Sequence, residues 1–256
     1  MATDRILDGT VALVTGASSG IGEVTARRLA AEGATVAVAA RRIDRLERLA
    51  REIGDAGGRA LAIESDVTDR SQAEALVERT VAELGRLDTV VNNAGVMLLG
   101  PAFDAPVEEW ERMVDLNVKG LLYVAKAALP HLLRFADEAP RMVTDLVNIS
   151  SVAGRRPRAG AAVYNATKFG VGAFSDALRQ EVTRRHVRVS LVEPGAVTTE
   201  LSSHNRPEVL EQLKGRFEDM ERLEADDIAD TISYVVTRPR HMAINEILVR
   251  PTEQSD

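Results

Sequence analysis

Short apolar runs that recur along the chain, separated by segments of helix length, constrain the fold more than any other feature of the sequence. The runs Val11-Ala12-Leu13-Val14 and Val36-Ala37-Val38-Ala39-Ala40 are apolar at every position, as strands must be when helices cover both faces of a sheet. Strands are expected at 10–14, 35–39, 59–63, 89–92, 143–149, 187–192 and 245–249, with crossover helices between them. This alternation predicts an α/β fold, a Rossmann-type doubly wound sheet of about seven parallel strands with helices on both faces.

Length and composition narrow the class of protein. One α/β domain accommodates 256 residues without a linker, so a single domain over 1–256 is expected. A net charge of −7 argues against nucleic-acid binding, because no uniformly basic surface is available. The absence of cysteine suits a reducing compartment such as the cytoplasm. No apolar run reaches the length of a membrane span, the charged N-terminus does not resemble a signal peptide, and the histidines lack metal-ligand spacing.

A glycine-rich turn follows the first strand directly. The segment Thr15-Gly16-Ala17-Ser18-Ser19-Gly20-Ile21-Gly22 leads into a helix, and glycine lets the backbone turn tightly and bring its N–H groups close to a pyrophosphate. The positive end of the helix dipole then faces the phosphates. An ordinary strand-to-helix turn is the alternative, but its place after the first strand favours a dinucleotide site.

The end of the second strand indicates which dinucleotide is bound. An acidic residue here would hydrogen-bond the ribose 2′-hydroxyl of NAD, but the sequence reads Ala39-Ala40-Arg41-Arg42 and offers no carboxylate before Asp44. A guanidinium at Arg41 could instead grip a 2′-phosphate through charge-assisted hydrogen bonds. The arginines could also be a solvated helix start, although cations there oppose the helix dipole. The pattern favours NADP(H).

Tyr164 and Lys168 are the strongest candidates for chemistry. Their i,i+4 spacing places both on one face of a helix expected from 161 to 185. An ammonium group beside a phenol should lower the phenol pKa toward neutrality, which suits a general acid or base. The alternative is an amphipathic surface pair.

Polar and glycine-containing segments follow other strands and should meet at the same sheet edge. They are Ser150-Ser151 after the fifth strand, Asn92-Asn93-Ala94-Gly95 after the fourth and Pro194-Gly195-Ala196-Val197-Thr198-Thr199 after the sixth. Ligands of doubly wound sheets bind at the carboxyl ends of the strands, so a serine hydroxyl here can polarise a carbonyl. Either serine alone is equally an ordinary turn former.

Together and in this order, these motifs resemble those of the short-chain dehydrogenase/reductase family, from about Gly9 to the C-terminus. Asp66-Val67 and Asn117, within Leu-Asn-Val-Lys-Gly, also match. The family's spacing of thirteen residues between serine and tyrosine selects Ser151 over Ser150. The ending Asn245 to Thr252 is similar to that of clavulanic-aldehyde dehydrogenases and 3-hydroxy acid or serine dehydrogenases. The resemblance implies an NADP(H)-dependent oxidoreductase of carbonyl or alcohol substrates.

By this resemblance, Tyr164 protonates the carbonyl oxygen as hydride is delivered, Ser151 holds that oxygen, Lys168 binds the nicotinamide ribose and lowers the tyrosine pKa, and Asn117 holds a relay water. The expected cofactor-binding residues are Gly16, Ser18, Ser19, Gly20, Ile21, Gly22, Arg41, Arg42, Asp66, Val67, Asn93, Ala94, Gly95, Tyr164, Lys168, Pro194, Gly195, Val197 and Thr199. The substrate is an aldehyde, a ketone or a 3-oxo or 3-hydroxy acid.

Other segments concern the substrate and partners. Residues 200–223, polar with scattered leucines and Phe217, are expected to form a mobile helical lid. Met97, Val152 and Leu201 are candidate pocket walls, with core packing as the alternative. Arg155, Arg156 and Arg158 could attract an anionic substrate, although a solvated loop is the favoured interpretation. Helices at 115–131 and 161–185 are apolar on more than one face, which favours a homodimer or homotetramer.

Two other functions remain open at this stage. A redox-sensing protein could keep the dinucleotide fold and bind NADP(H) without chemistry, although such a sensor has no need of Asn117, Ser151, Tyr164 and Lys168. Nucleotide-sugar epimerases share Tyr-x3-Lys but are usually longer and have a different glycine spacing.

Overall fold

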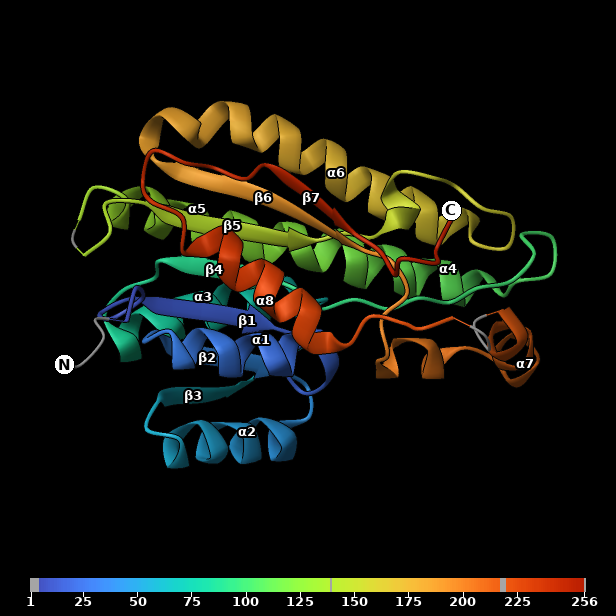
Figure 1. Cartoon of the computed structure of the whole chain (residues 1–256), viewed down its shortest axis with the longest axis horizontal. Coiled ribbons are helices and arrows are strands. Elements are labelled where there is room, and N and C mark those ends of the chain that lie inside the picture. Colours follow the sequence, from blue (N-terminus) through green and yellow to red (C-terminus); the bar gives the residue numbers. More distant parts are fainter. Residues whose placement is uncertain (1–4, 139, 217–219, 256) are drawn as a thin grey trace.

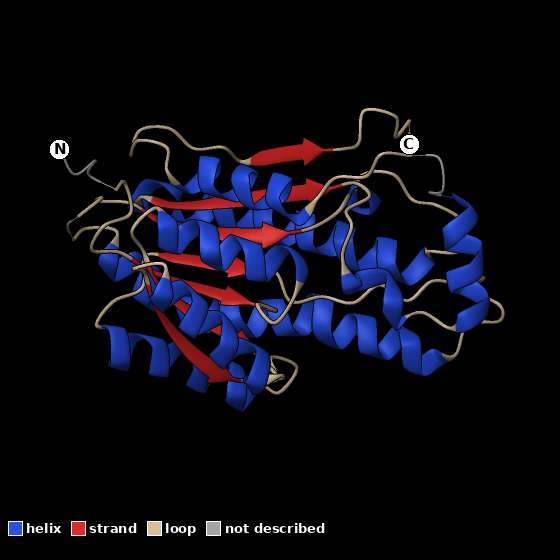
Figure 2. Cartoon of the chain, turned by 60° about the horizontal axis from the view of Figure 1, so that its bottom comes forward, coloured by secondary structure: helices blue, strands red, loops and turns tan. Residues whose placement is uncertain are grey.

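Seven strands form one sheet in which all neighbouring strands are parallel, in the order β3-β2-β1-β4-β5-β6-β7 (Figures 1 and 2). This computed structural model describes residues 5–138, 140–216 and 220–255. The strands are β1 (Val11–Thr15), β2 (Thr35–Ala40), β3 (Arg59–Glu64), β4 (Thr89–Asn92), β5 (Thr144–Ile149), β6 (Val187–Pro194) and β7 (Glu246–Val249). The predicted Rossmann-type sheet is confirmed, with small shifts at the strand ends.

Helices cover both faces of the sheet. They are α1 (Gly20–Ala31), α2 (Ile43–Asp55), α3 (Arg70–Leu84), α4 (Val107–Val114), α5 (Leu121–Phe135), α6 (Ala162–Val182), α7 (Pro207–Arg216) and α8 (Ala225–Val236). A π-helix, η1 (Asp115–Gly120), joins α4 to α5, and the 3₁₀ helices are η2 (Val152–Gly154), η3 (Thr183–Arg185) and η4 (Glu200–His204). Helices α1, α2 and α8 pack on one face, and α3, α5 and α6 pack on the other.

The apolar strands divide their side chains between two cores. In β2, Val36 and Val38 belong to the core under α1, α2 and α8, whereas Ala37 and Ala39 belong to the core under α3 and α5. Successive strand residues point to opposite faces, so a central strand covered on both sides must be apolar throughout. The edge strands β3 and β7 are only partly buried.

The helix expected to begin at Asp115 is longer than the sequence indicated. It starts at Val107 as α4, passes through the π-helix and continues as α5. Glu108 and Glu109 lie in its first turn, where carboxylates are favourable beside the positive end of the helix dipole. The apolar residues Val107, Trp110 and Met113 recur at helical spacing in α4 and were missed, whereas a π-turn leaves no clear periodic signal.

Of the expected lid at 200–223, residues 200–204 and 207–216 are helical, whereas 220–223 are not. After β6 the chain forms η4 and then α7, which lies beyond the carboxyl ends of the strands and apart from the sheet (Figure 1). Phe217 and its two following neighbours lie outside the described residues, as do the first four residues of the N-terminus. None of the helices in the described ranges is long and apolar enough to cross a membrane.

Candidate active site

A cleft of about 920 Å³ opens at the carboxyl ends of the strands. Strands β2 and β4 flank β1 on opposite sides, so the chain reverses its winding direction there, and ligands of doubly wound sheets bind at such a switch point. All the site residues predicted from the sequence line the cleft except Gly22 and Asn117.

The glycine turn is packed so closely that side chains cannot enter it. Gly16 has φ +65°, and a Cβ there would lie 2.8 Å from the Cα of Ala94. A Cβ at Gly22 would lie 2.5 Å from the Gly16 carbonyl oxygen. The Asn93 side chain donates hydrogen bonds to the carbonyls of Thr15 and Gly16, at 3.0 and 3.2 Å. Asn93 therefore braces the turn, and Gly22 packs behind it.

The start of α1 is open to an anion. Ser19 occupies the N-cap position, but its hydroxyl does not cap the helix and accepts a hydrogen bond from Arg42 at 2.9 Å instead. The first N–H groups of a helix need a partner, and a phosphate supplies one. The turn thus has the geometry of a phosphate cradle.

The two arginines after β2 have different surroundings. Arg42 donates to the hydroxyl of Ser18 at 2.9 Å and pairs with Glu200 at 3.0 Å. The Arg41 side chain is 66% exposed, and the nearest carboxylate oxygen, of Asp66, lies 4.0 Å away. Arg42 is therefore joined to the phosphate-binding turn, whereas Arg41 stands at the rim.

The serine, tyrosine and lysine meet in the cleft. The Ser151 hydroxyl lies near the Tyr164 phenol and acts to lower the pKa of that phenol. The Lys168 ammonium group donates to the Ile149 carbonyl at 2.8 Å and lies 5.8 Å from the centroid of the tyrosine ring. The hydroxyl of Ser150 donates instead to the Lys168 carbonyl, so Ser151 is the serine that contacts the tyrosine.

The pKa of Tyr164 is raised, whereas the sequence predicted that it would be lowered. Burial raises the pKa of Tyr164 to about 12, although the hydrogen bond with Ser151 acts to lower it. Burial also lowers the pKa of Lys168 to about 8. Loss of solvation disfavours the charged form of each group, and the expected lowering of the Tyr164 pKa by the Lys168 ammonium is not found.

Asn117 lies behind the cleft in the π-helix and is only 2% exposed. Its side-chain amide is occupied by the backbone of Val96 and by the hydroxyl of Thr167. The side-chain amide of Asn117 is therefore already engaged with protein groups.

The other end of the cleft is lined by mixed side chains. Met97, Val152 and Leu201 line it, as does Arg158. Arg155, in contrast, is bound to Glu193 at 2.8 Å and to Glu246, so its charge is already neutralised. Of the three arginines considered as anion attractors, Arg158 is the one that reaches the cleft.

Two residues near the site were not singled out in the sequence. Arg45 pairs with Glu200 at 2.9 Å, and its i,i+3 spacing from Arg42 is a signal that was available. Asn205 accepts a hydrogen bond from the Leu99 N–H at 2.7 Å. No local pattern indicates that contact, because the partners are 106 residues apart.

Within the described ranges, no group of three or more histidine, aspartate or glutamate side chains could hold a metal ion.

Comparison with known families gives a match to short chain dehydrogenases over residues 10–210. A solved serine dehydrogenase in its closed form with NADP+ is similar, with a TM-score of 0.88 and 36% identity, covering 96% of this chain and 97% of that one.

Two further similar proteins show how relatives vary: one is much longer than this chain, and the other is complexed with NADH. Glycine betaine reductase ATRR of Emericella nidulans is 40% identical over 97% of this chain, which spans only 19% of that protein. The solved 3-ketoacyl-(acyl-carrier-protein) reductase of Brucella melitensis, complexed with NADH, has a TM-score of 0.83 and 32% identity, covering 95% of this chain and 97% of that one.

Proposed function

The chain belongs to the short-chain dehydrogenase family, and from that premise we propose that it is an NADP(H)-dependent oxidoreductase acting on a carbonyl or alcohol, with Tyr164 as general acid or base. One observation carries the proposal: Ser151, Tyr164 and Lys168 meet in the cleft that the glycine turn also lines. The substrate class is an aldehyde, a ketone or a 3-oxo or 3-hydroxy acid.

The residues around the cleft fit a dinucleotide with a 2′-phosphate. The turn can pack this tightly only with glycine, because a Cβ at Gly16 would collide with Ala94. The start of α1, which has no side-chain cap, leaves N–H groups for a phosphate. Arg42 presents its guanidinium beside the hydroxyls of Ser18 and Ser19, and a guanidinium forms charge-assisted hydrogen bonds with phosphate. Since similar structures carry either NADP+ or NADH, the preference for NADP(H) rests on Arg42.

NADP(H), when bound, supplies or accepts the hydride. Ser151 is placed to hold the substrate oxygen, and Tyr164 to give that oxygen its proton as the new C–H bond forms. With its pKa raised to about 12, the phenol is protonated at neutral pH, which is the form that a proton donor in carbonyl reduction requires. Lys168 lies on the same buried helix face, where it is suited to bind the nicotinamide ribose.

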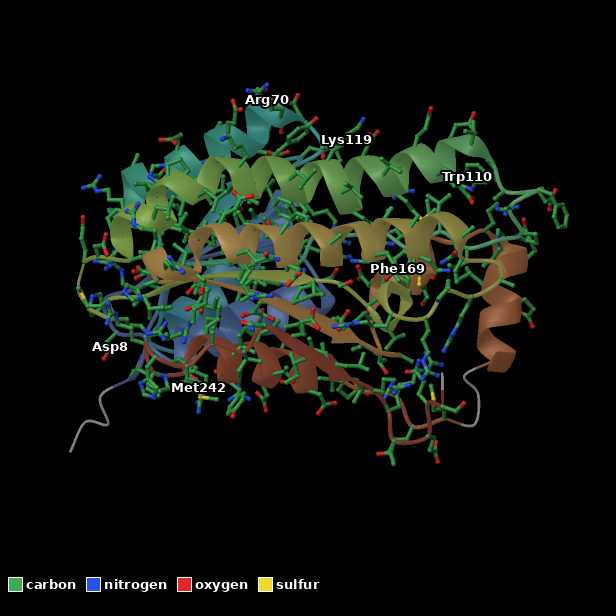
Figure 3. The ribbon with its side chains drawn as sticks, turned by 90° about the horizontal axis from the view of Figure 1, so that it is seen from above. Asp8, Arg70, Trp110, Lys119, Phe169 and Met242 are labelled. Atoms are coloured by element: carbon green, nitrogen blue, oxygen red, sulfur yellow. The ribbon has the colours of Figure 1, made fainter. Side chains whose placement is uncertain are left out.

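An oligomer is part of the proposal. Figure 3 shows α4 and α6 side by side, with Phe169 on α6. Phe169 is 43% exposed and Val114, on α4, is 37% exposed, which suits burial against a second copy. Size measurement in solution at micromolar concentration tests for a homodimer or homotetramer, and a monomer would contradict it.

A cytoplasmic location remains a prediction from the cysteine-free sequence.

The central experiment measures NADPH oxidation with a panel of aldehydes, ketones and 3-oxo acids, with NADH in parallel. Tyr164→Phe should reduce turnover by about 100-fold or more, because general acid catalysis contributes on that scale, while NADPH affinity and the melting temperature stay close to wild type. Tight NADPH binding with no turnover on any substrate would favour a sensing protein instead.

A further inference from the structure

We propose that Glu200 is a cofactor-selectivity residue. Its carboxylate pairs with Arg42 and Arg45 and must release Arg42 before that arginine can bind a 2′-phosphate. This competition couples recognition of the phosphate to the position of the lid. The inference rests on the proposed NADP(H) function and deepens it. The segment that Glu200 begins, residues 200–206, is termed the strap.

The first observation is the sharing of Arg42. Its guanidinium donates to the hydroxyls of Ser18 and Ser19 at 2.9 Å each and also pairs with Glu200 at 3.0 Å. Arg45 holds both oxygens of the same carboxylate, at 2.9 and 3.1 Å. Carboxylate and phosphate use the same fork of N–H donors on a guanidinium. A 2′-phosphate at this corner therefore competes with Glu200 for the same donors.

The second observation is that the two ends of the strap are held differently. At the far end, Asn205 is buried, and its amide bonds the Leu99 N–H at 2.7 Å and the Met97 carbonyl at 2.9 Å. Breaking buried hydrogen bonds of this kind is costly. Glu200, in contrast, is 46% exposed, and exposed ion pairs are weak. The Glu200 end is therefore the one that releases, with Asn205 as the fixed end.

The third observation links the strap to both halves of the cleft. Thr199, which precedes the strap, packs on the glycine turn, because a Cβ at Gly20 would lie 3.2 Å from the Thr199 Cβ. Leu201 and His204, within the strap, line the cleft together with Leu210 of α7. Displacement of Glu200 at the phosphate corner thus alters the wall of the substrate end.

The ion pairs persist over the physiological pH range. Arg45 and Arg42 lower the pKa of Glu200 to about 2, so the carboxylate is charged at any pH at which the enzyme works. A competing anion, and not a change of pH, is what releases the strap.

The first test compares NADPH and NADH dissociation constants for the wild type and Glu200→Gln. Removing the competing carboxylate should tighten NADPH binding by about 3- to 10-fold, a change expected of two exposed ion pairs, and leave NADH within about 2-fold. Glu208→Gln is the matched control: Glu208 lies in the same lid and pairs with Arg206 at 2.9 Å, away from Arg42. It should change neither constant.

The possible outcomes distinguish the role of Glu200 from the proposed NADP(H)-dependent function. If the wild type prefers NADPH but Glu200→Gln leaves that preference unchanged or weakens it, the inference is wrong and the proposed function stands. An equal gain for NADPH and NADH also overturns the inference. If the wild type binds neither nucleotide, both proposals fail.

A second measurement follows the strap directly through chymotrypsin cleavage after Leu201, since Arg206 precedes Pro207 and is not a trypsin site. Adenosine 2′,5′-bisphosphate carries the competing phosphate but cannot reach the nicotinamide end of the cleft, so it should increase cleavage of the wild type. Adenosine 5′-monophosphate, which lacks that phosphate, should not. Glu200→Gln should be cleaved at the higher rate without either nucleotide. Equal cleavage under all these conditions would show that Glu200 does not hold the strap.

Discussion

The side-chain amide of Asn117 is joined to both backbone groups of Val96. Its Oδ1 accepts a hydrogen bond from the Val96 N–H and its Nδ2 donates to the Val96 carbonyl, both at 2.8 Å. Asn117 lies in the π-helix between α4 and α5, and Val96 directly follows Gly95 in the cofactor-binding edge. This pairing fixes the edge of the cleft to the helix behind it.

Asn117→Ala should therefore lower the free energy of unfolding by about 1 to 3 kcal/mol, because the buried polar groups of Val96 lose their partners. Activity should fall as well, since Gly95 lines the cleft that we propose binds the cofactor. Urea denaturation measures the loss. Gln180→Ala on the exposed face of α6 serves as control, with an expected change within about 0.5 kcal/mol. A loss no larger than that of the control would contradict the structural role of Asn117.

The lowered pKa of Lys168 predicts a pH dependence of stability. The pKa is about 8 in the folded chain against 10.5 for a free lysine, so between pH 8 and 10.5 the unfolded chain binds more protons. Stability due to Lys168 must then rise with pH across that window, by at most about 3 kcal/mol. Measured as the difference between wild type and Lys168→Met, a flat or falling profile would argue against a buried, desolvated ammonium.

The two arginines after β2 should differ in their effect on cofactor choice. Arg42→Ala should lower the ratio of NADPH to NADH affinity by about 10- to 100-fold, since charge-assisted hydrogen bonds to phosphate are lost. Arg41→Ala should have a smaller effect, because the Arg41 side chain is 66% exposed. Arg48→Ala, in the same helix α2, is the control. A larger effect at Arg41 than at Arg42 would reverse this assignment.

Two glycines should respond oppositely to alanine. Gly22→Ala places a Cβ 2.5 Å from the Gly16 carbonyl, so it should spread the phosphate-binding turn and weaken NADPH binding by at least about 10-fold, as a misplaced binding group does. Normal NADPH affinity in the Gly22 variant would show that the turn adapts.

Gly54→Ala, in helix α2 with no atom within 4 Å of the new Cβ, should stabilise the chain by about 0.5 to 1 kcal/mol.

Much of this protein could be predicted from local sequence. The strands were visible because a central parallel strand is buried on both faces, as in Val11 to Val14, and shows a continuous apolar run. The place of the glycine turn and the i,i+4 spacing of Tyr164 and Lys168 are equally local. The π-turn at Asp115–Gly120 was not predicted, because it breaks the helical period on which such predictions depend.

By itself, then, the sequence determined where the strands lie along the chain, because a buried strand shows itself in its own run of apolar residues. Its motifs, through the family they resemble, also indicated most of the residues that line the cleft. Only the tertiary structure decided which partners those residues have. Glu200 meets Arg42 across 158 residues, and Asn205 meets Leu99 across 106. The direction of the Tyr164 pKa also depends on folding, since desolvation is a property of the surroundings that the whole chain builds around the phenol.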